Sequence, residues 1–181
     1  MKICPSAKVW LVLRAFLIIF VFGLTVHESA FSQSHNFRAI STVKTNFISD
    51  FNDDEREIFE LVNVERRKKR LKNVDWNDDL SRVARKYSQQ MAKGNFFGHF
   101  DKSGRGMEER ADAAKINWSQ IGENLYFREG IGDFNFAAVK GWMQSPSHRE
   151  NILTGNWTET GVGVAESRDG KIYITQLFIT N

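Results

Sequence analysis

Residues 171–179 constrain the fold more than any other segment, because they predict a strand that is apolar on both faces. Its apolar side chains are Ile172, Ile174 and Phe178 on one face and Tyr173, Leu177 and Ile179 on the other. A strand with two apolar faces has to be covered on both sides. The segment therefore predicts a sheet that lies between two further layers.

The same strand is predicted to be the second half of a hairpin. Residues 160–165 form a second apolar run, and Asp169-Gly170 in the connection between the two runs is a strong turn signal. Amphipathic helices are expected ahead of the hairpin, and they can supply both covering layers. The first helix covers residues 53–70 and directs Ile58, Leu61 and Val62 inward. The second is capped by Asn77 or Asp78 and stops at Gly94, with an inward face of Leu80, Val83, Ala84, Tyr87 and Met91. A short helix over residues 107–115 follows, and a last helix ends before Pro146 and directs Phe136, Val139, Trp142 and Met143 inward. We thus expect an α+β fold, a three-layer α-β-α sandwich with a small central antiparallel sheet.

The N-terminus predicts export. Three basic residues, Lys2, Lys8 and Arg14, come before an uncharged and mostly apolar run over residues 15–26. A run of this length is typical of the apolar core of a signal peptide and is too short to span a bilayer. We predict a signal peptide over residues 1–32, a linker over 33–50 and one domain over 51–181, in an extracellular or periplasmic location. The alternative is an uncleaved anchor over residues 9–26, which would be the only membrane contact.

Charge and cysteine content exclude other classes. The formal net charge is +3, and loss of residues 1–32 removes three basic residues and Glu28, which leaves +1 and no case for a nucleic-acid partner. The basic run 66–70 is interpreted as a solvated helix end. The single cysteine, Cys4, lies in the predicted signal peptide, so the mature domain would have no disulfide and would depend on its core.

Three ionisable residues are candidates for a functional site. Ser145 and Pro146 predict the start of a helix whose first turn contains His148, where the helix dipole favours a neutral imidazole. His99 lies in a phenylalanine-rich segment. Glu123 has apolar neighbours, so its carboxylate has to find a donor, reach solvent or bind a cation.

The order of several short motifs resembles the CAP superfamily, or SCP domain, in its bacterial form without disulfides. These motifs are His99, Gly122-Glu123-Asn124, Trp142 with Ser145-Pro146, and His148 with Asn151. The resemblance implies an α-β-α sandwich with a cleft lined by His99, Glu123 and His148. In some members that cleft binds a divalent cation. The second cleft glutamate of many eukaryotic members is not evident, because Gln144 stands near its expected place and Glu159 is too far along the sequence.

The resemblance leaves several functions open. Two imidazoles and a carboxylate match the three protein ligands of an open zinc site, so His99, Glu123 and His148 are predicted to be the metal ligands, with zinc as the example. We expect an exported binding or interaction module whose partner is a lipid, a polysaccharide or a protein at the cell envelope. The alternatives are a metal-assisted hydrolase that uses the same cleft and a structural domain, and no catalytic residue is assigned.

Overall fold

The computed structural model describes residues 52–130 and 132–181. The predicted signal peptide or anchor and the linker up to residue 50 lie outside the described residues. Within these residues, no helix has the length and apolar character that a membrane span requires.

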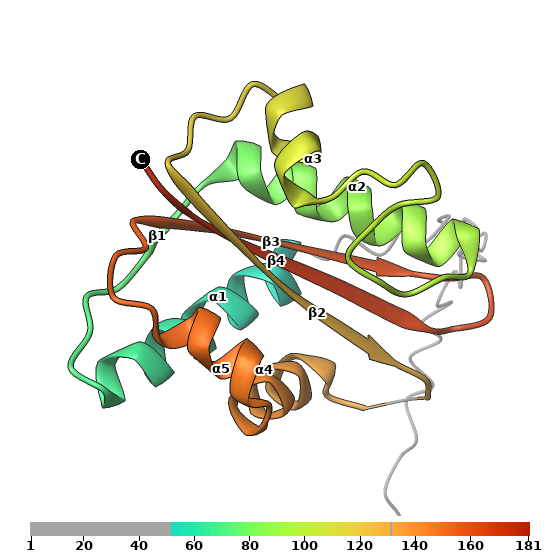
Figure 1. Ribbon diagram of the computed structural model, residues 1–181. Helices are drawn as coiled ribbons and strands as arrows, with labels where there is room; N and C mark the ends of the chain where they lie inside the picture. Colours follow the sequence, from blue (N-terminus) through green and yellow to red (C-terminus); the bar gives the residue numbers. More distant parts are fainter. Residues whose placement is uncertain (1–51, 131) are drawn as a thin grey trace, which may run out of the picture. The chain divides into compact units, whose positions relative to one another are not determined.

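A four-stranded sheet forms the middle of the fold (Figure 1). Its strands are β1 (Asp75–Trp76), β2 (Gln120–Arg128), β3 (Glu159–Glu166) and β4 (Ile172–Thr180), in the order β1-β3-β4-β2. The predicted hairpin is β3 and β4, and β2 pairs antiparallel with β4. The two-residue β1 pairs parallel with β3, so the sheet is mixed and not wholly antiparallel as expected. A strand of this length is too short to show a two-residue alternation in the sequence.

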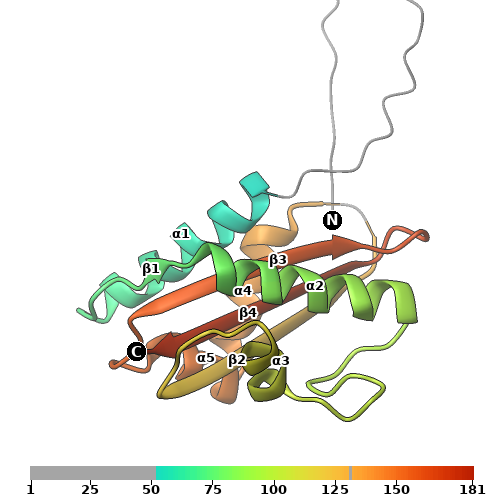
Figure 2. The same cartoon turned by 90° about the horizontal axis from the view of Figure 1, so that it is seen from above.

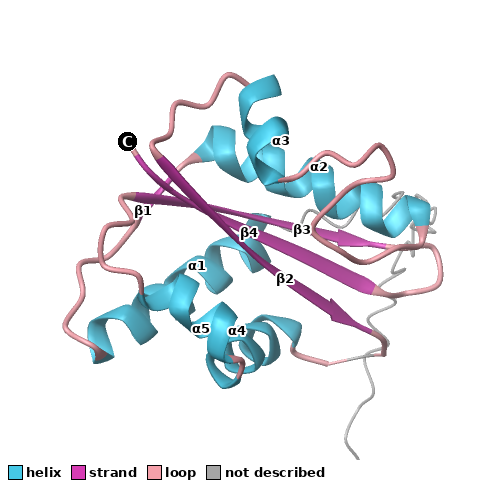
Figure 3. Ribbon diagram, in the orientation of Figure 1, coloured by secondary structure: helices cyan, strands magenta, loops and turns pink. Residues whose placement is uncertain are grey.

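Helices cover both faces of the sheet, which confirms the three-layer prediction (Figure 3). One layer contains α2 (Asp78–Gly94) and α3 (Met107–Ala113). The opposite layer contains α1 (Asn52–Lys68), α4 (Phe134–Gln144) and α5 (Pro146–Leu153).

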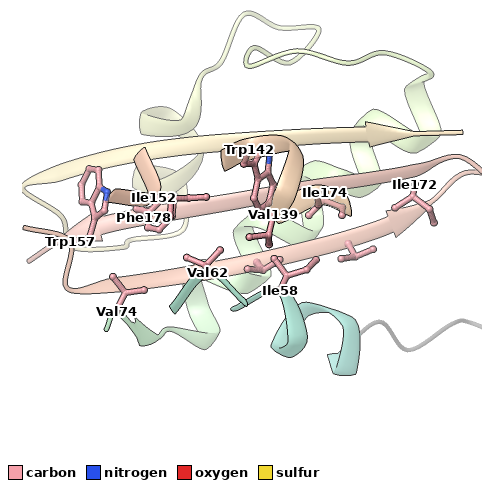
Figure 4. Packing of buried hydrophobic residues seen from close by; sticks show 13 residues of the cluster. Ile58, Val62, Val74, Val139, Trp142, Ile152, Trp157, Ile172, Ile174 and Phe178 are labelled. Carbon is pink, nitrogen blue, oxygen red and sulfur yellow. The ribbon is translucent and has the colours of Figure 1, made fainter. Parts of the chain in front are cut away.

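The two faces of β4 enter different parts of the core, as its apolar alternation predicts. Ile172, Ile174 and Phe178 pack with the side chains of α1, α4 and α5 (Figure 4), whereas Leu177 and Ile179 pack against α2. Phe136 was expected to face the core and is 56% exposed instead. Ala138, in the same helical turn, is buried instead of Phe136. The buried face of α4 is therefore rotated about the helix axis relative to the predicted one.

Helix α2 shows how local sequence sets a helix end. The side chain of Asn77 accepts a hydrogen bond from the backbone N–H of Leu80 at 2.8 Å, which is the predicted cap. At the other end, the predicted stop Gly94 is still helical. Asn95 takes the left-handed conformation with φ of 47°, a role that asparagine fills more readily than most residues.

Arg66 departs from its predicted role as part of a solvated helix end. Its side chain is fully buried, and its guanidinium donates to the carbonyl oxygens of Lys72 at 2.9 Å and of Ile152 and Thr154 at 2.7 Å. The rest of the run, residues 67–70, is exposed. Arg66 therefore joins the end of α1 to the end of α5.

Helix α2 lies over β3 (Figure 2). The two backbones are so close that two positions of β3 have no room for a side chain. A Cβ atom at Gly163 would lie 1.9 Å from the backbone nitrogen of Arg85, and one at Gly161 would lie 2.3 Å from that of Ser81. Because backbone atoms cannot move aside as a flexible side chain can, the spacing of these layers depends on glycine here.

We expect Gly163→Ala to lower the free energy of unfolding by about 3 kcal/mol or more, since the added methyl group forces α2 away from the sheet. Chemical denaturation of the purified domain measures this loss. Gly155→Ala is the matched control: its Cβ would meet only Leu71 at 4.0 Å, so stability should be nearly unchanged. Equal stability of the Gly163→Ala variant and the parent would contradict the packing described.

Candidate functional site

A cleft of about 340 Å³ lies at β2, one of the two edge strands of the sheet, between the segment that leads into α3 and the start of α5. His99, Glu123 and His148 all line it, so the structure brings the three predicted residues together. His99 comes from the loop after α2, Glu123 from β2 and His148 from α5. The two helical layers thus supply opposite walls.

Glu123 finds the partners that its burial requires. Its side chain is 1% exposed, and Oε1 accepts a hydrogen bond from Nδ1 of His99 at 2.8 Å. Oε2 accepts a second hydrogen bond from Nη2 of Arg110. Of the three outcomes left open by the sequence, the carboxylate has therefore found donors.

Arg110 of α3 is the main site residue that the sequence did not reveal. Besides Glu123, its guanidinium reaches the carbonyl oxygens of His99 at 3.0 Å and Arg105 at 3.2 Å. Its Cζ lies 3.4 Å from the ring centroid of Tyr87, where a cation is attracted to the face of the ring. Burial raises the pKa of Tyr87 to about 12, so the phenol stays neutral beneath the guanidinium. In sequence Arg110 is one charge of a short charged helix, and nothing distinguishes it there.

Two asparagines join β2 to α5. Nδ2 of Asn124 donates to the carbonyl oxygen of His148 at 3.2 Å, and Nδ2 of Asn151 donates to the carbonyl oxygen of Glu123 at 3.0 Å. Nδ2 of Asn151 also donates to Oδ1 of Asn124 at 2.9 Å. These hydrogen bonds hold the backbones of Glu123 and His148 in fixed relation.

The two cleft histidines have opposite protonation preferences. The hydrogen bond to Glu123 raises the pKa of His99, although burial opposes it in part. Burial lowers the pKa of His148, and the nearby His99 lowers it further. A neutral His148 agrees with the sequence prediction. Ser145 is its helix N-cap as expected, with Pro146 at the first position, but the serine side chain makes no capping hydrogen bond.

A second carboxylate also lines the cleft. Among the described residues it is Glu108 of α3, and not Gln144 or Glu159, that faces this space. Glu159 instead accepts hydrogen bonds from Asn77 and Asn181 at the start of β3. Glu108 is next to Met107, far in sequence from the position where a second acid was sought.

A zinc ion needs protein ligands whose donor atoms converge on one point. Both oxygens of Glu123 already accept hydrogen bonds, and residues 52–130 and 132–181 contain no group of three acid, histidine or cysteine side chains placed to hold a metal. Nδ1 of His99 faces Glu123, and within the described residues Nε2 of His99 has no hydrogen bond. A carboxylate bound to the far nitrogen of a histidine ligand orients that ligand. The three-ligand set remains a prediction, and this geometry favours an orienting role for Glu123.

Comparisons with known proteins agree on one family. Residues 59–178 match the profile of the cysteine-rich secretory protein (CAP) family. Over 160 residues the chain is 34% identical to the uncharacterized protein YkwD of Bacillus subtilis, covering 86% of this chain and 60% of that protein. It is 35% identical over 125 residues to the uncharacterized membrane protein YlbC of the same organism, covering 69% of this chain and 34% of that protein. The chain thus spans from about a third to three fifths of these relatives.

A solved structure gives the same result. An extracellular protein containing an SCP domain from Bacillus anthracis superposes with a TM-score of 0.64 at 29% identity, covering 72% of this chain and 41% of that chain.

We expect the two cleft histidines to titrate in a fixed order, which NMR of their ring protons measures. The pKa of His99 should lie above the ordinary histidine value, because of its hydrogen bond to Glu123, and the pKa of His148 below it, because of burial. In Glu123→Gln the pKa of His99 should fall, whereas the exposed control Glu60→Gln should leave it unchanged. Because protonated His99 is favoured in the folded state, its contribution to stability is present below its unfolded pKa and is lost as the pH rises through its folded pKa. The reverse titration order would contradict the hydrogen bond between His99 and Glu123.

Arg110→Met should lower the free energy of unfolding by about 3–5 kcal/mol, because it leaves a buried carboxylate without its cation. The double variant Arg110→Met with Glu123→Leu should recover most of that loss, since no charge then remains to be paired. Denaturant titrations of the single and double variants measure the coupling. Lys68→Met, which breaks the exposed pair with Glu65, should cost less than about 1 kcal/mol. A cost for Arg110→Met no larger than that of this control would disprove the proposed importance of the pair.

Proposed function

Because the chain belongs to the cysteine-rich secretory protein (CAP) family, we propose that it is an exported binding module whose ligand enters the cleft of His99, Glu123 and His148. The basic and apolar N-terminal residues support export, as does the extracellular relative from Bacillus anthracis. The volume of the cleft is at the lower end of the range for small-molecule sites, so it suits a small ligand or one unit of a polymer.

The observation that carries this proposal is that the buried carboxylate of Glu123 is already hydrogen-bonded by two neighbouring side chains. A general base has to reach the water or hydroxyl that it activates, and a buried carboxylate that is paired with a cation is a weak proton acceptor. Both oxygens of Glu123 are held by His99 and Arg110, and the carboxylate is 1% exposed. Glu123 is thus better suited to orient His99 than to remove a proton.

A metal-assisted hydrolase is the alternative, and His148 is its best candidate base. Its neutral imidazole has the right protonation state. Catalytic histidines, however, are usually oriented by a third group on the other ring nitrogen. In the described part of the chain, the ring of His148 has no hydrogen-bonding partner, which favours binding over hydrolysis.

The cleft is also proposed to hold a divalent cation such as zinc, through Nε2 of His99 and the ring of His148. Two protein ligands give a weaker site than the three of an open catalytic zinc centre. In this scheme Glu123 acts from behind His99, by fixing the direction of its ring.

Titration calorimetry with zinc tests this proposal. His148→Ala should abolish the binding heat, whereas Glu123→Gln should weaken affinity about tenfold, as expected for loss of an orienting partner and not of a ligand. His35→Ala, outside the described residues, is the matched control and should change nothing.

Hydrolysis of peptide and ester libraries by the same proteins separates the two functions. We expect rates at the background of buffer for the parent domain and for His148→Ala. Turnover by the parent that disappears in His148→Ala would establish the hydrolase and overturn the binding proposal.

A further inference from the structure

An aromatic ring and a carboxylate meet at the rim of the cleft, over Gly106. Phe100 is 67% exposed, although it is a large apolar side chain. A Cβ atom at Gly106 would lie 3.3 Å from Cε1 of Phe100 and 3.1 Å from Oε2 of Glu108. The carboxylate of Glu109, at 3.2 Å from the same point, accepts a hydrogen bond from the backbone N–H of Gly106. Phe100 and Glu108 therefore both lie close to Gly106, and both line the cleft.

The loop that carries Phe100 is held in place by hydrogen bonds on either side of it. The carboxylate of Asp101 accepts from the backbone N–H groups of Ser103 at 2.8 Å and Arg105 at 3.0 Å. Arg110 binds the carbonyl oxygen of His99, the residue before Phe100, at 3.0 Å. The exposed ring is therefore presented by an ordered segment, which lowers the entropy cost of binding a ligand against it.

Three polar side chains that line the same cleft as this ring remain available for a ligand. In the part of the chain that the structure describes, the side chains of Glu108, Ser147 and His148 have no hydrogen bond or ion pair. The cleft therefore offers one apolar surface with a carboxylate, a hydroxyl and an imidazole around it.

From this arrangement we propose that the cleft binds a neutral sugar ring of a polysaccharide, stacked on Phe100, with sugar hydroxyl groups bound by Glu108 and Ser147. The inference rests on the proposed binding function and names its ligand class. A sugar ring has an apolar C–H face, which the negative face of an aromatic ring attracts, and hydroxyl groups around its edge. A carboxylate accepts from such hydroxyl groups and repels phosphate or sulfate groups.

A lipid chain fits the same surface poorly. Acyl chains need a continuous apolar lining, because each polar group that is buried without a partner costs free energy. Here His99, Glu108, Ser147 and His148 interrupt the apolar surface of Phe100, Met107 and Ile121. The observations thus favour a ligand with both an apolar face and hydrogen-bonding groups.

Titration of the isotope-labelled domain with β-1,4-linked tetramers of glucose and of N-acetylglucosamine, followed by NMR, tests this inference. At millimolar sugar, at least one tetramer should give saturable shifts in residues 98–109 and 147–151. Phe100→Ala should weaken binding about tenfold, and Phe100→Trp should restore it, because stacking requires an aromatic face. Phe100→Leu should behave like Phe100→Ala. Phe136→Ala removes another exposed phenylalanine, 56% exposed on α4, and should have no effect.

Absence of saturable shifts with both tetramers would overturn the inference, as would full binding by Phe100→Leu. The inference would also be overturned, in favour of a membrane surface as the partner, if the parent domain sedimented with phosphatidylglycerol vesicles and the Phe100→Ala variant did not. Zinc titration of Phe100→Ala keeps the two proposals apart, because this variant retains both imidazoles and should bind zinc like the parent. If the parent binds zinc but neither sugar, only the sugar inference is rejected. If titration of the parent with zinc gives no binding heat, the result counts against the cation site.

Discussion

Glu123 and Arg110 form an ion pair that is almost completely removed from water, with side chains 1% and 8% exposed. Removing two charges from water costs several kcal/mol, and their attraction offsets this only when the geometry is good and further hydrogen bonds are present. Here β2 supplies the carboxylate, α3 the guanidinium, the preceding loop the imidazole of His99, and α2 the ring of Tyr87. The pair thus fixes four segments around one wall of the cleft.

The opposite wall depends on neutral hydrogen bonds. Asn124 and Asn151 tie the start of α5 to β2 through backbone carbonyl oxygens. His148 faces the cleft, and within the described residues its ring makes no hydrogen bond. Both walls rest on a sheet whose distance from α2 is set by Gly161 and Gly163. The base of the cleft is therefore fixed by packing and hydrogen bonds, and it is lined by three side chains, those of Glu108, Ser147 and His148, that have no hydrogen bond within the described residues.

The structure places the three predicted site residues in one cleft, together with two charged residues that the prediction did not include, and their role as a functional site stays a prediction. His99, Glu123 and His148 line one cleft, as the ordered motifs implied. Arg110 and Glu108 were missed because each is one charge in a short charged helix, where the usual interpretation is a solvated surface. Their roles depend on how α3 packs beside β2, and no periodicity in the sequence encodes that contact.

The sequence by itself determined the two-faced strand β4, the hairpin, most helix boundaries and the three layers, because these follow from local propensity and from the spacing of apolar residues. Only the tertiary structure decided which charges are buried and which groups satisfy them. Arg66 and Arg67 show the difference, since they are neighbours in one basic run. Arg66 is fully buried against carbonyl oxygens from α5, and Arg67 is exposed. The physical reason is that partners far apart in sequence meet only when whole elements pack, and Glu123 found Arg110 in the same way.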